Sequence, residues 1–487
     1  MRVATHIFEP SKTRDVIEDA LGSDVSYYGE APAPRYLYVP LRHSQALSAD
    51  HGLVVGIRGA GKSVWWAALQ SEEHRSVVTA ALPNLALDKI SAVSAGFGEK
   101  NRPDDYPDKR ILDQLLIEGV QPAEIWRTVI AWNTWGRNGG LADMPTWSKK
   151  AEWVQANPEL TARSFKQYDD YLSAKDDKHL VLFDALDRSA DDWAGLRKLL
   201  RGLLESLLEF RSFRAIRGKA FVRPDMLDDP EIITFRDASK VMASKVELRW
   251  ARADLYGLLF QRLSNSSRGG DDFRSGCEDL GSGRWEEKRG IWQVPKPLRE
   301  DEELQRRVFD AVAGKWMGRD HRRGFPYTWL PSHLADAAEQ VSPRSFLAAI
   351  RTAAENSRGY GYSEYALHYE GIKKGVQEAS RIRVDEVRED FFWVSALMEP
   401  LRGLVIPCEF EEIASRWKRY SVIESLRRQA PSGALLPKHI DGGLEGLKED
   451  LLDLALFSLQ RDDRINMPDV YRVGFGLGRK GGVKPIR

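Results

Sequence analysis

Short apolar runs alternate along this chain with longer stretches in which apolar residues recur every three or four positions. Runs of the first kind are typical of strands buried in a parallel sheet, and stretches of the second kind are typical of amphipathic helices. The alternation predicts an α/β fold with a central parallel sheet. Strands are predicted in the segments 52–55, 75–82, 179–183, 219–225 and 246–250.

The strongest helical periodicity lies between residues 193 and 210, where leucines recur on one side of a predicted helix. We interpret this stripe as core packing, because it does not continue for the further heptads that a coiled coil requires. Segment 122–135 carries a similar apolar stripe with the same interpretation. Other helices are predicted at 10–21, 250–263, 301–316, 331–337, 342–356, 384–400, 409–416, 419–428 and 444–460.

The first apolar run leads directly into the sequence GIRGAGKS at residues 56–63. This sequence matches G-x-x-x-x-G-K-[ST], the P-loop that holds nucleotide phosphates, and it has the strand before it and the helix after it that the motif requires. Glycines let successive backbone amides point at one anion, and the helix N-terminus adds its positive dipole end. The residues predicted to bind the nucleotide here are Gly56, Gly59, Ala60, Gly61, Lys62, Ser63 and Val64.

A P-loop predicts particular roles for its last two polar side chains. Lys62 would reach the β- and γ-phosphates of ATP, and the Ser63 hydroxyl would bind Mg²⁺. A second metal ligand is predicted at Asp184, which follows the apolar run 179–183. Polar residues at the carboxyl ends of parallel strands meet at one edge of the sheet, so Asp184 is expected to lie opposite Ser63. The predicted cofactors are therefore ATP and Mg²⁺.

Changes in composition divide the rest of the chain. Segment 265–300 is rich in Gly, Ser, Arg and Asp and poor in aliphatic residues, which predicts a flexible surface loop. Near the C-terminus, helical runs precede a predicted strand-turn-strand at 462–475, which suggests a winged-helix-like module. The predicted regions are a lead-in at 1–39, a P-loop ATPase core at 40–264, a flexible insertion at 265–300, a helical lid at 301–375 and a mostly helical, winged-helix-like domain at 376–487.

Composition excludes several other classes. The 487 residues are 42% hydrophobic and 30% charged, which is typical of a globular protein. Lys plus Arg and Asp plus Glu are equal at 72 each, so net charge gives no indication of nucleic acid. Two cysteines cannot form a disulfide framework or a zinc site by themselves. With no signal-peptide pattern and no apolar run near the ~20 residues of a membrane span, a cytoplasmic protein without membrane contact is expected.

Taken in order, these elements resemble the AAA+/STAND superclass of P-loop ATPases over about residues 40–375. Residues 183–188, FDALDR, resemble the STAND and KAP-type Walker B motif, and 219–225 occupies the place of the sensor 1 strand. The triplet Ser342-Pro343-Arg344 resembles the start of the lid helix that carries sensor 2. The resemblance implies that Arg344 contacts the γ-phosphate and couples hydrolysis to lid movement.

One position departs from the usual AAA+ pattern. Ala185 stands where many of these proteins place a glutamate that polarises the attacking water. The resemblance therefore transfers the water-orienting role to Asp187, so that the expected catalytic residues are Lys62, Asp184 and Asp187. It also favours slow hydrolysis. Candidates for an arginine finger are Arg188, Arg223 and Arg252.

Three functions follow as hypotheses. The resemblance implies an ATP-driven conformational switch that acts on an unidentified partner protein, in a bacterial antiviral defence setting, with a homo-oligomer among the assemblies it allows. The first alternative is a DNA-directed ATPase that uses its winged-helix-like domain and the basic tail from residue 472 onward. The second alternative is a nucleotide-binding scaffold with negligible hydrolysis, which is suggested by Ala185.

Overall fold

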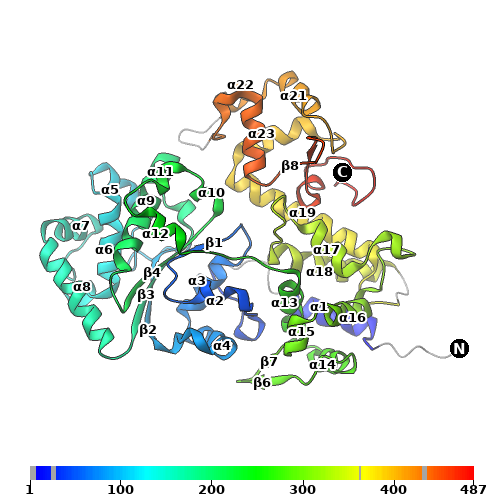
Figure 1. Cartoon of the computed structure of the whole chain (residues 1–487), viewed down its shortest axis with the longest axis horizontal. Helices are drawn as coiled ribbons and strands as arrows, with labels where there is room; N and C mark the ends of the chain where they lie inside the picture. Colours follow the sequence, from blue (N-terminus) through cyan, green and yellow to red (C-terminus); the bar gives the residue numbers. More distant parts are fainter. Residues whose placement is uncertain (1–6, 23–28, 361–363, 430–435, 487) are drawn as a thin grey trace.

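The computed structural model describes residues 7–22, 29–360, 364–429 and 436–486. The chain forms a sheet-containing half, built from the elements β1 to β5 with their helices, and a helical half that begins at α13 (Figure 1). The N-terminal helix α1, Pro10–Leu21, packs against the second half rather than the first. A third group of helices, α20 to α24, lies beyond α19.

The central sheet has five parallel strands in the order β2-β3-β4-β1-β5. Because all strands run in the same direction, their carboxyl ends lie along one edge, where ligands bind in sheets of this kind. The predicted α/β fold with a central parallel sheet is confirmed. The strands are β1 Leu53–Val55, β2 Ile90–Phe97, β3 Lys178–Phe183, β4 Ile216–Val222 and β5 Lys245–Glu247.

Helices cover both faces of the sheet, which explains why the inner strands are apolar without alternation. On one face, α3 Lys62–Gln70 and α4 Glu72–Ala81 follow the P-loop (Figure 1). On the other face, Trp126 of α6 donates a hydrogen bond to the Leu199 carbonyl of α9 at 2.7 Å. The further helices of this half are α2 Ser44–Leu47, α5 Lys109–Ile117, α6 Pro122–Thr134, α7 Trp147–Ala156, α8 Pro158–Ser173, α9 Trp193–Phe210, α10 Pro224–Leu227, α11 Pro230–Ile233 and α12 Ala238–Ala243.

The helical half has its own core, in which the rings of Tyr256 and Tyr327 stack at 4.3 Å with Phe309 and Phe346 beside them. Its long helix α19, Tyr369–Asp390, packs along α18 and continues toward the C-terminal group of helices. The predicted boundary at 375/376 falls inside this single helix. The other elements are α13 Arg252–Ser264, α14 Gly270–Asp279, β6 Glu286–Lys288, β7 Ile291–Gln293, α15 Lys296–Glu300, α16 Glu302–Ala313, α17 Pro326–Leu334 and α18 Pro343–Ser357.

The C-terminal group ends in a small antiparallel hairpin, as the pattern predicted, but the hairpin lies earlier than expected. It pairs β8, Ser458–Leu459, with β9, Ile465–Asn466, and residue Cys408 bridges to Ile465 on the other side. The second predicted strand is instead the helical turn α24, Asp469–Arg472. The helices of this group are α20 Phe392–Met398, α21 Phe410–Arg419, α22 Val422–Gln429 and α23 Gly443–Asp453.

Two further predictions about local structure were wrong. Segment 75–82, predicted as the second strand, belongs to α4, because Ser71 caps the helix by accepting from the His74 amide and Glu72 and Glu73 complement its dipole. The second strand is β2 instead. Segment 265–300 is not a flexible loop, since it contains α14 and the β6–β7 hairpin and buries Phe273. A few large apolar side chains are enough to order a polar segment.

In the described part of the chain, no helix combines the length and the apolar character that a membrane crossing requires.

Candidate nucleotide-binding site

The P-loop, residues 56–63, connects β1 to α3 at the carboxyl edge of the sheet. Gly59 has a φ of 78° and Gly61 a φ of 98°, values in the left-handed region that glycine adopts without strain. Gly61 is also the N-cap residue of α3. A Cβ at Gly59 would lie 2.3 Å from the Ser342 Oγ, so a close approach of the lid also requires glycine there. The loop thus has the backbone form that the motif predicts.

The Lys62 side chain folds back onto this loop. Its Nζ donates hydrogen bonds to the carbonyl oxygens of Gly56, at 2.8 Å, and Ile57, at 3.1 Å. Burial lowers the pKa of Lys62 to about 8, against the opposing effect of the Asp184 carboxylate. A nearby phosphate would favour the charged form of the lysine and compete with the two carbonyl groups.

Asp184 lies at the end of β3, next to the start of α3, where its carboxylate accepts a hydrogen bond from the Ser63 hydroxyl. The side chain is buried, and burial raises its pKa to about 6, although the Ser63 hydrogen bond and the Lys62 charge act in the opposite direction. A hydroxyl and a carboxylate in contact are the oxygen ligands that Mg²⁺ prefers. The two residues predicted as metal ligands are therefore adjacent and chemically suited to the ion.

Asp187 lies on the short turn that follows β3. Ala185, with a φ of 54°, starts this turn in the left-handed region, and Asp187 then faces the end of β4. There its carboxylate forms an ion pair with the Arg223 guanidinium at 3.4 Å. Asp187 therefore lies at the correct edge of the sheet, but an arginine already holds its carboxylate.

Of the three arginine-finger candidates, only Arg223 belongs to this group of contacts. It follows β4 directly and pairs with Asp225 at 3.0 Å and with Asp390 at 2.9 Å. Arg188 pairs with Glu99, and Arg252 lies on α13, where it pairs with Glu302 of α16.

Helix α18, which the sequence assigned to the predicted lid, begins against the P-loop. Ser342, its N-cap residue, donates a hydrogen bond to the Gly59 carbonyl at 3.3 Å. Arg344 lies in the next turn with its side chain half exposed, and its guanidinium pairs with Glu386 of α19 at 2.8 Å. Arg344 therefore lies beside the P-loop and has a carboxylate as its partner, and its contact with a γ-phosphate stays a prediction.

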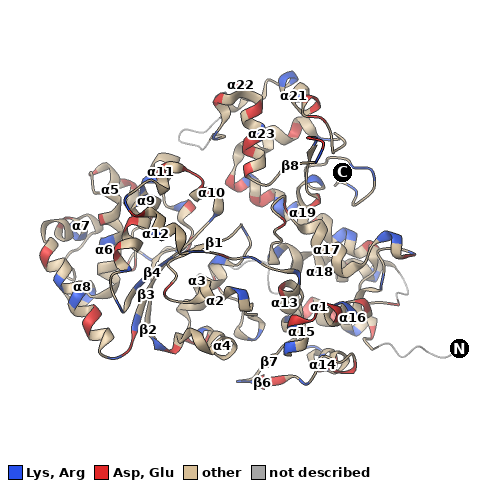
Figure 2. Ribbon diagram, in the orientation of Figure 1, with Lys and Arg blue, Asp and Glu red and all other residues tan. Residues whose placement is uncertain are grey.

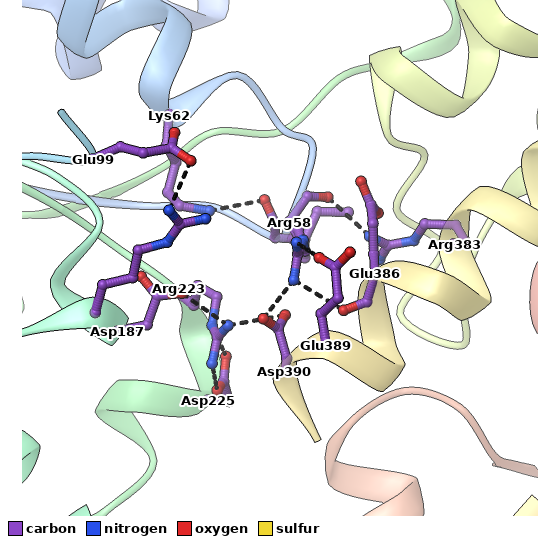
Figure 3. A network of polar contacts seen from close by, with 12 residues as sticks. Arg58, Lys62, Glu99, Asp187, Arg223, Asp225, Arg383, Glu386, Glu389 and Asp390 are labelled. Carbon is purple, nitrogen blue, oxygen red and sulfur yellow. Dashed lines mark hydrogen bonds and ion pairs between the residues drawn. The ribbon is translucent and has the colours of Figure 1, made fainter. Parts of the chain in front are cut away.

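Sequence reasoning missed the strongest group of contacts made by the P-loop. The Arg58 side chain donates to the Glu386 carbonyl at 2.9 Å and to the carboxylates of Asp390 and Glu389, each at 2.5 Å (Figure 3). We call Glu386, Glu389 and Asp390 the α19 acid cluster. Acids at a helix C-terminus are disfavoured by the helix dipole, so cations are expected near them. That is the only signal in the sequence that could have indicated this contact.

A second arginine, which belongs to α19 itself, also contacts the α19 acid cluster. Arg383, which is buried, donates to the Arg58 carbonyl at 3.0 Å and pairs with Glu386 at 2.9 Å. The Arg383 Nη2 donates a hydrogen bond to the Tyr471 hydroxyl at 3.0 Å. The P-loop, the lid and the C-terminal group of helices therefore meet in one continuous set of ionic contacts.

No protein-family model matches the chain, and no curated protein sequence does. Among solved structures, the ORC2 protein of Aeropyrum pernix in its ADPNP-ADP complexes is similar at 14% identity, with 94% of each chain covered and a TM-score of 0.41. Its ADP form is 14% identical, with 94% of this chain and 93% of that chain covered and a TM-score of 0.31. Cdc6p from Pyrobaculum aerophilum is 12% identical, with 91% and 94% covered and a TM-score of 0.31.

Proposed function

We propose that this chain is an ATPase of the AAA+ P-loop class that works slowly, as a conformational switch. The observation that carries the proposal is the contact between Ser63 and Asp184 beside a P-loop of the correct form. Phosphate oxygens would accept hydrogen bonds from the loop amides and from Lys62. Mg²⁺ bound by Ser63 and Asp184 would neutralise charge on the phosphates.

The switch is supported by the contacts between the P-loop and the α19 acid cluster. Arg58 belongs to the loop that must adjust to the phosphates, and its partners lie at the end of α19. This helix has 22 residues, so it extends over roughly 33 Å. A small movement of Arg58 would therefore change the contacts of a rigid element that reaches both the lid and the C-terminal helices.

In this proposal Arg344 exchanges partners. It pairs with Glu386 when no phosphate is near, and it turns toward the γ-phosphate when ATP is bound. ATP and ADP would then stabilise different positions of α18 relative to α19. A partner protein would distinguish the two positions, and bacterial defence and homo-oligomer formation remain expectations from the resemblance alone.

The proposal is tested by measuring ATP binding and single-turnover hydrolysis with the full chain, followed by hydrogen exchange of residues 369–398 with ATP and with ADP. Binding, slow hydrolysis and a difference in exchange between the two nucleotides are expected. Binding without any hydrolysis would instead support the scaffold hypothesis. Equal exchange in the two states would contradict the switch.

DNA binding receives less support from the structure than it had from the sequence. Arg472, in the basic tail, is buried and bonded to Asp469, and Arg479 pairs with the same carboxylate at 2.8 Å. The helix before the hairpin, α23, exposes the acids Glu445, Glu449 and Asp453. Acidic side chains on that face would repel phosphates. A salt-dependent DNA-binding assay on the full chain remains the test of this alternative.

A further inference from the structure

The turn that follows Asp184 carries one carboxylate, and it belongs to a larger group of ion pairs. Ala185 has no polar side chain, and Asp187 pairs at 3.4 Å with Arg223, which also pairs with Asp225 and Asp390. Phosphoryl transfer to water needs a group that orients the water and accepts its proton. The identity of this group matters only if the chain hydrolyses ATP, so the inference rests on the proposed function. The neighbouring strand β2 offers a candidate.

Strand β2 lies directly beside β3, with Phe97 opposite Phe183. The pairing continues past both strands, because the Asp184 amide donates to the Phe97 carbonyl at 3.1 Å. Glu99 follows β2 by two residues, at the carboxyl edge where β2 and β3 both end. Neighbouring strands are about 4.8 Å apart, a distance that a glutamate side chain can cross. An acid that follows the neighbouring strand is therefore present at the same edge of the sheet as Asp184.

The Glu99 side chain is held toward β3 rather than away from it. Its Oε1 accepts from the Arg188 Nη1 at 2.9 Å, and Arg188 ends the turn that follows Asp184. Only 17% of the Glu99 side chain is exposed. Figure 3 shows Glu99 on the side of the site opposite to the α19 acid cluster.

The backbone before Glu99 is fixed against the helix that follows the P-loop. A Cβ at Gly98 would lie 2.5 Å from the Trp66 ring, so the glycine lets this segment pack closely on α3. Trp66 in turn donates to the Leu182 carbonyl of β3 at 3.4 Å. The carboxylate is thus carried by a segment whose position is set by both α3 and β3. Such a position is suited to a group that must be aligned with a phosphate bound at the start of α3.

We propose that Glu99 is the catalytic carboxylate that orients and deprotonates the attacking water. The water oxygen forms a bond to the γ-phosphorus, and the bond from that phosphorus to the β,γ-bridging oxygen breaks. The electron pair of the broken bond goes to the bridging oxygen of ADP. The proton of the water goes to the Glu99 carboxylate and then to solvent, and the products are ADP and inorganic phosphate. Arg188 acts as a positioning residue, and Asp187 holds Arg223.

The test compares variants of the full chain in two separate measurements, equilibrium binding of ATP and single-turnover hydrolysis. Glu99→Gln keeps the size of the side chain and an acceptor for Arg188 but removes the base. It is expected to lower the hydrolysis rate about 100-fold or more, while ATP affinity stays within about threefold of the parent chain. Retained affinity also shows that the variant is folded.

The matched control is Glu209→Gln near the end of α9, which removes a carboxylate that also pairs with an arginine, Arg127, at 3.0 Å. It lies outside the site and is expected to leave both hydrolysis and ATP affinity within about threefold of the parent chain. If Glu99→Gln hydrolyses ATP at the parental rate while Asp187→Asn does not, Glu99 is not the base and Asp187 is, and the proposed ATPase function survives. If the parent chain itself shows neither binding nor hydrolysis, the proposed function and this inference both fail.

Discussion

The Arg58 guanidinium in the P-loop donates a hydrogen bond of 2.5 Å to the carboxylate of Asp390, which is 332 residues further along the chain. The same carboxylate pairs with Arg223 at the end of β4, so one acid at the end of α19 contacts the P-loop and the strand beside it (Figure 3). Both arginines lie at the edge where a nucleotide would bind. Figure 2 shows that elsewhere positions of Lys and Arg alternate with positions of Asp and Glu along the elements of the chain.

Replacing Asp390 with Asn is expected to loosen the end of α19. Its side chain is only 13% exposed and has two arginine partners, so its loss should lower the free energy of unfolding by about 1–3 kcal/mol. Chemical denaturation measures this change. Glu389→Gln is the control, because Glu389 also pairs with Arg58 but is 67% exposed, and its effect should stay within about 0.5 kcal/mol. Equal effects would show that burial does not strengthen the Asp390 contact.

Replacing Lys62 with Ala is expected to abolish ATP hydrolysis and to weaken ATP binding at least tenfold, roughly the loss of one charge-assisted contact. Isothermal titration and single-turnover hydrolysis measure the two effects. An exposed lysine such as Lys480 serves as the control and should leave both unchanged when replaced by Ala. Full activity of the Lys62→Ala chain would remove the basis of the ATPase proposal.

Stability is expected to fall between pH 6.5 and about 4 because of His43. This residue is buried between Trp65 and Trp250, and burial lowers its pKa from 6.5 to about 4. The unfolded chain therefore binds a proton at a higher pH than the folded chain, so acid favours unfolding, by about 3 kcal/mol in all. Chemical denaturation at several pH values should show a smaller pH dependence for His43→Gln, whereas replacing the exposed His321 should leave it unchanged.

Replacing Arg472 with Ala is expected to destabilise the C-terminal group of helices strongly. Arg472 is 0% exposed, pairs with Asp469 at 2.7 Å and donates to the carbonyls of Leu477 and Val483. Its loss would leave a buried carboxylate with fewer partners, at a cost of roughly 3–5 kcal/mol. Thermal unfolding measures this cost, and Lys480→Ala should change it by less than about 0.5 kcal/mol. A neutral Arg472→Ala would indicate that the tail is free to contact other molecules.

Much of the fold followed from local patterns. The apolar run before Asp184 predicted β3 almost to the residue, and the leucine stripe predicted α9 with the observed bounds. The segment 75–82 was misread because its two adjacent valines suit a strand, while the capping contact of Ser71 made it a helix. The bounds of helices and strands were predicted most accurately where the local residue pattern and the burial of the segment favour the same secondary structure.

The backbone form of the P-loop was determined by the local sequence alone, since the glycines at 59 and 61 and the flanking strand and helix set the loop within a few residues. Only the tertiary structure decided which charges meet there. Glu99 lies at the same edge of the sheet as Asp184 because β2 pairs with β3, and Arg58 meets Asp390 because α19 returns to that edge. Such contacts depend on how distant segments pack against one another. Local sequence patterns predict helices and strands, but they do not predict which distant residues come into contact.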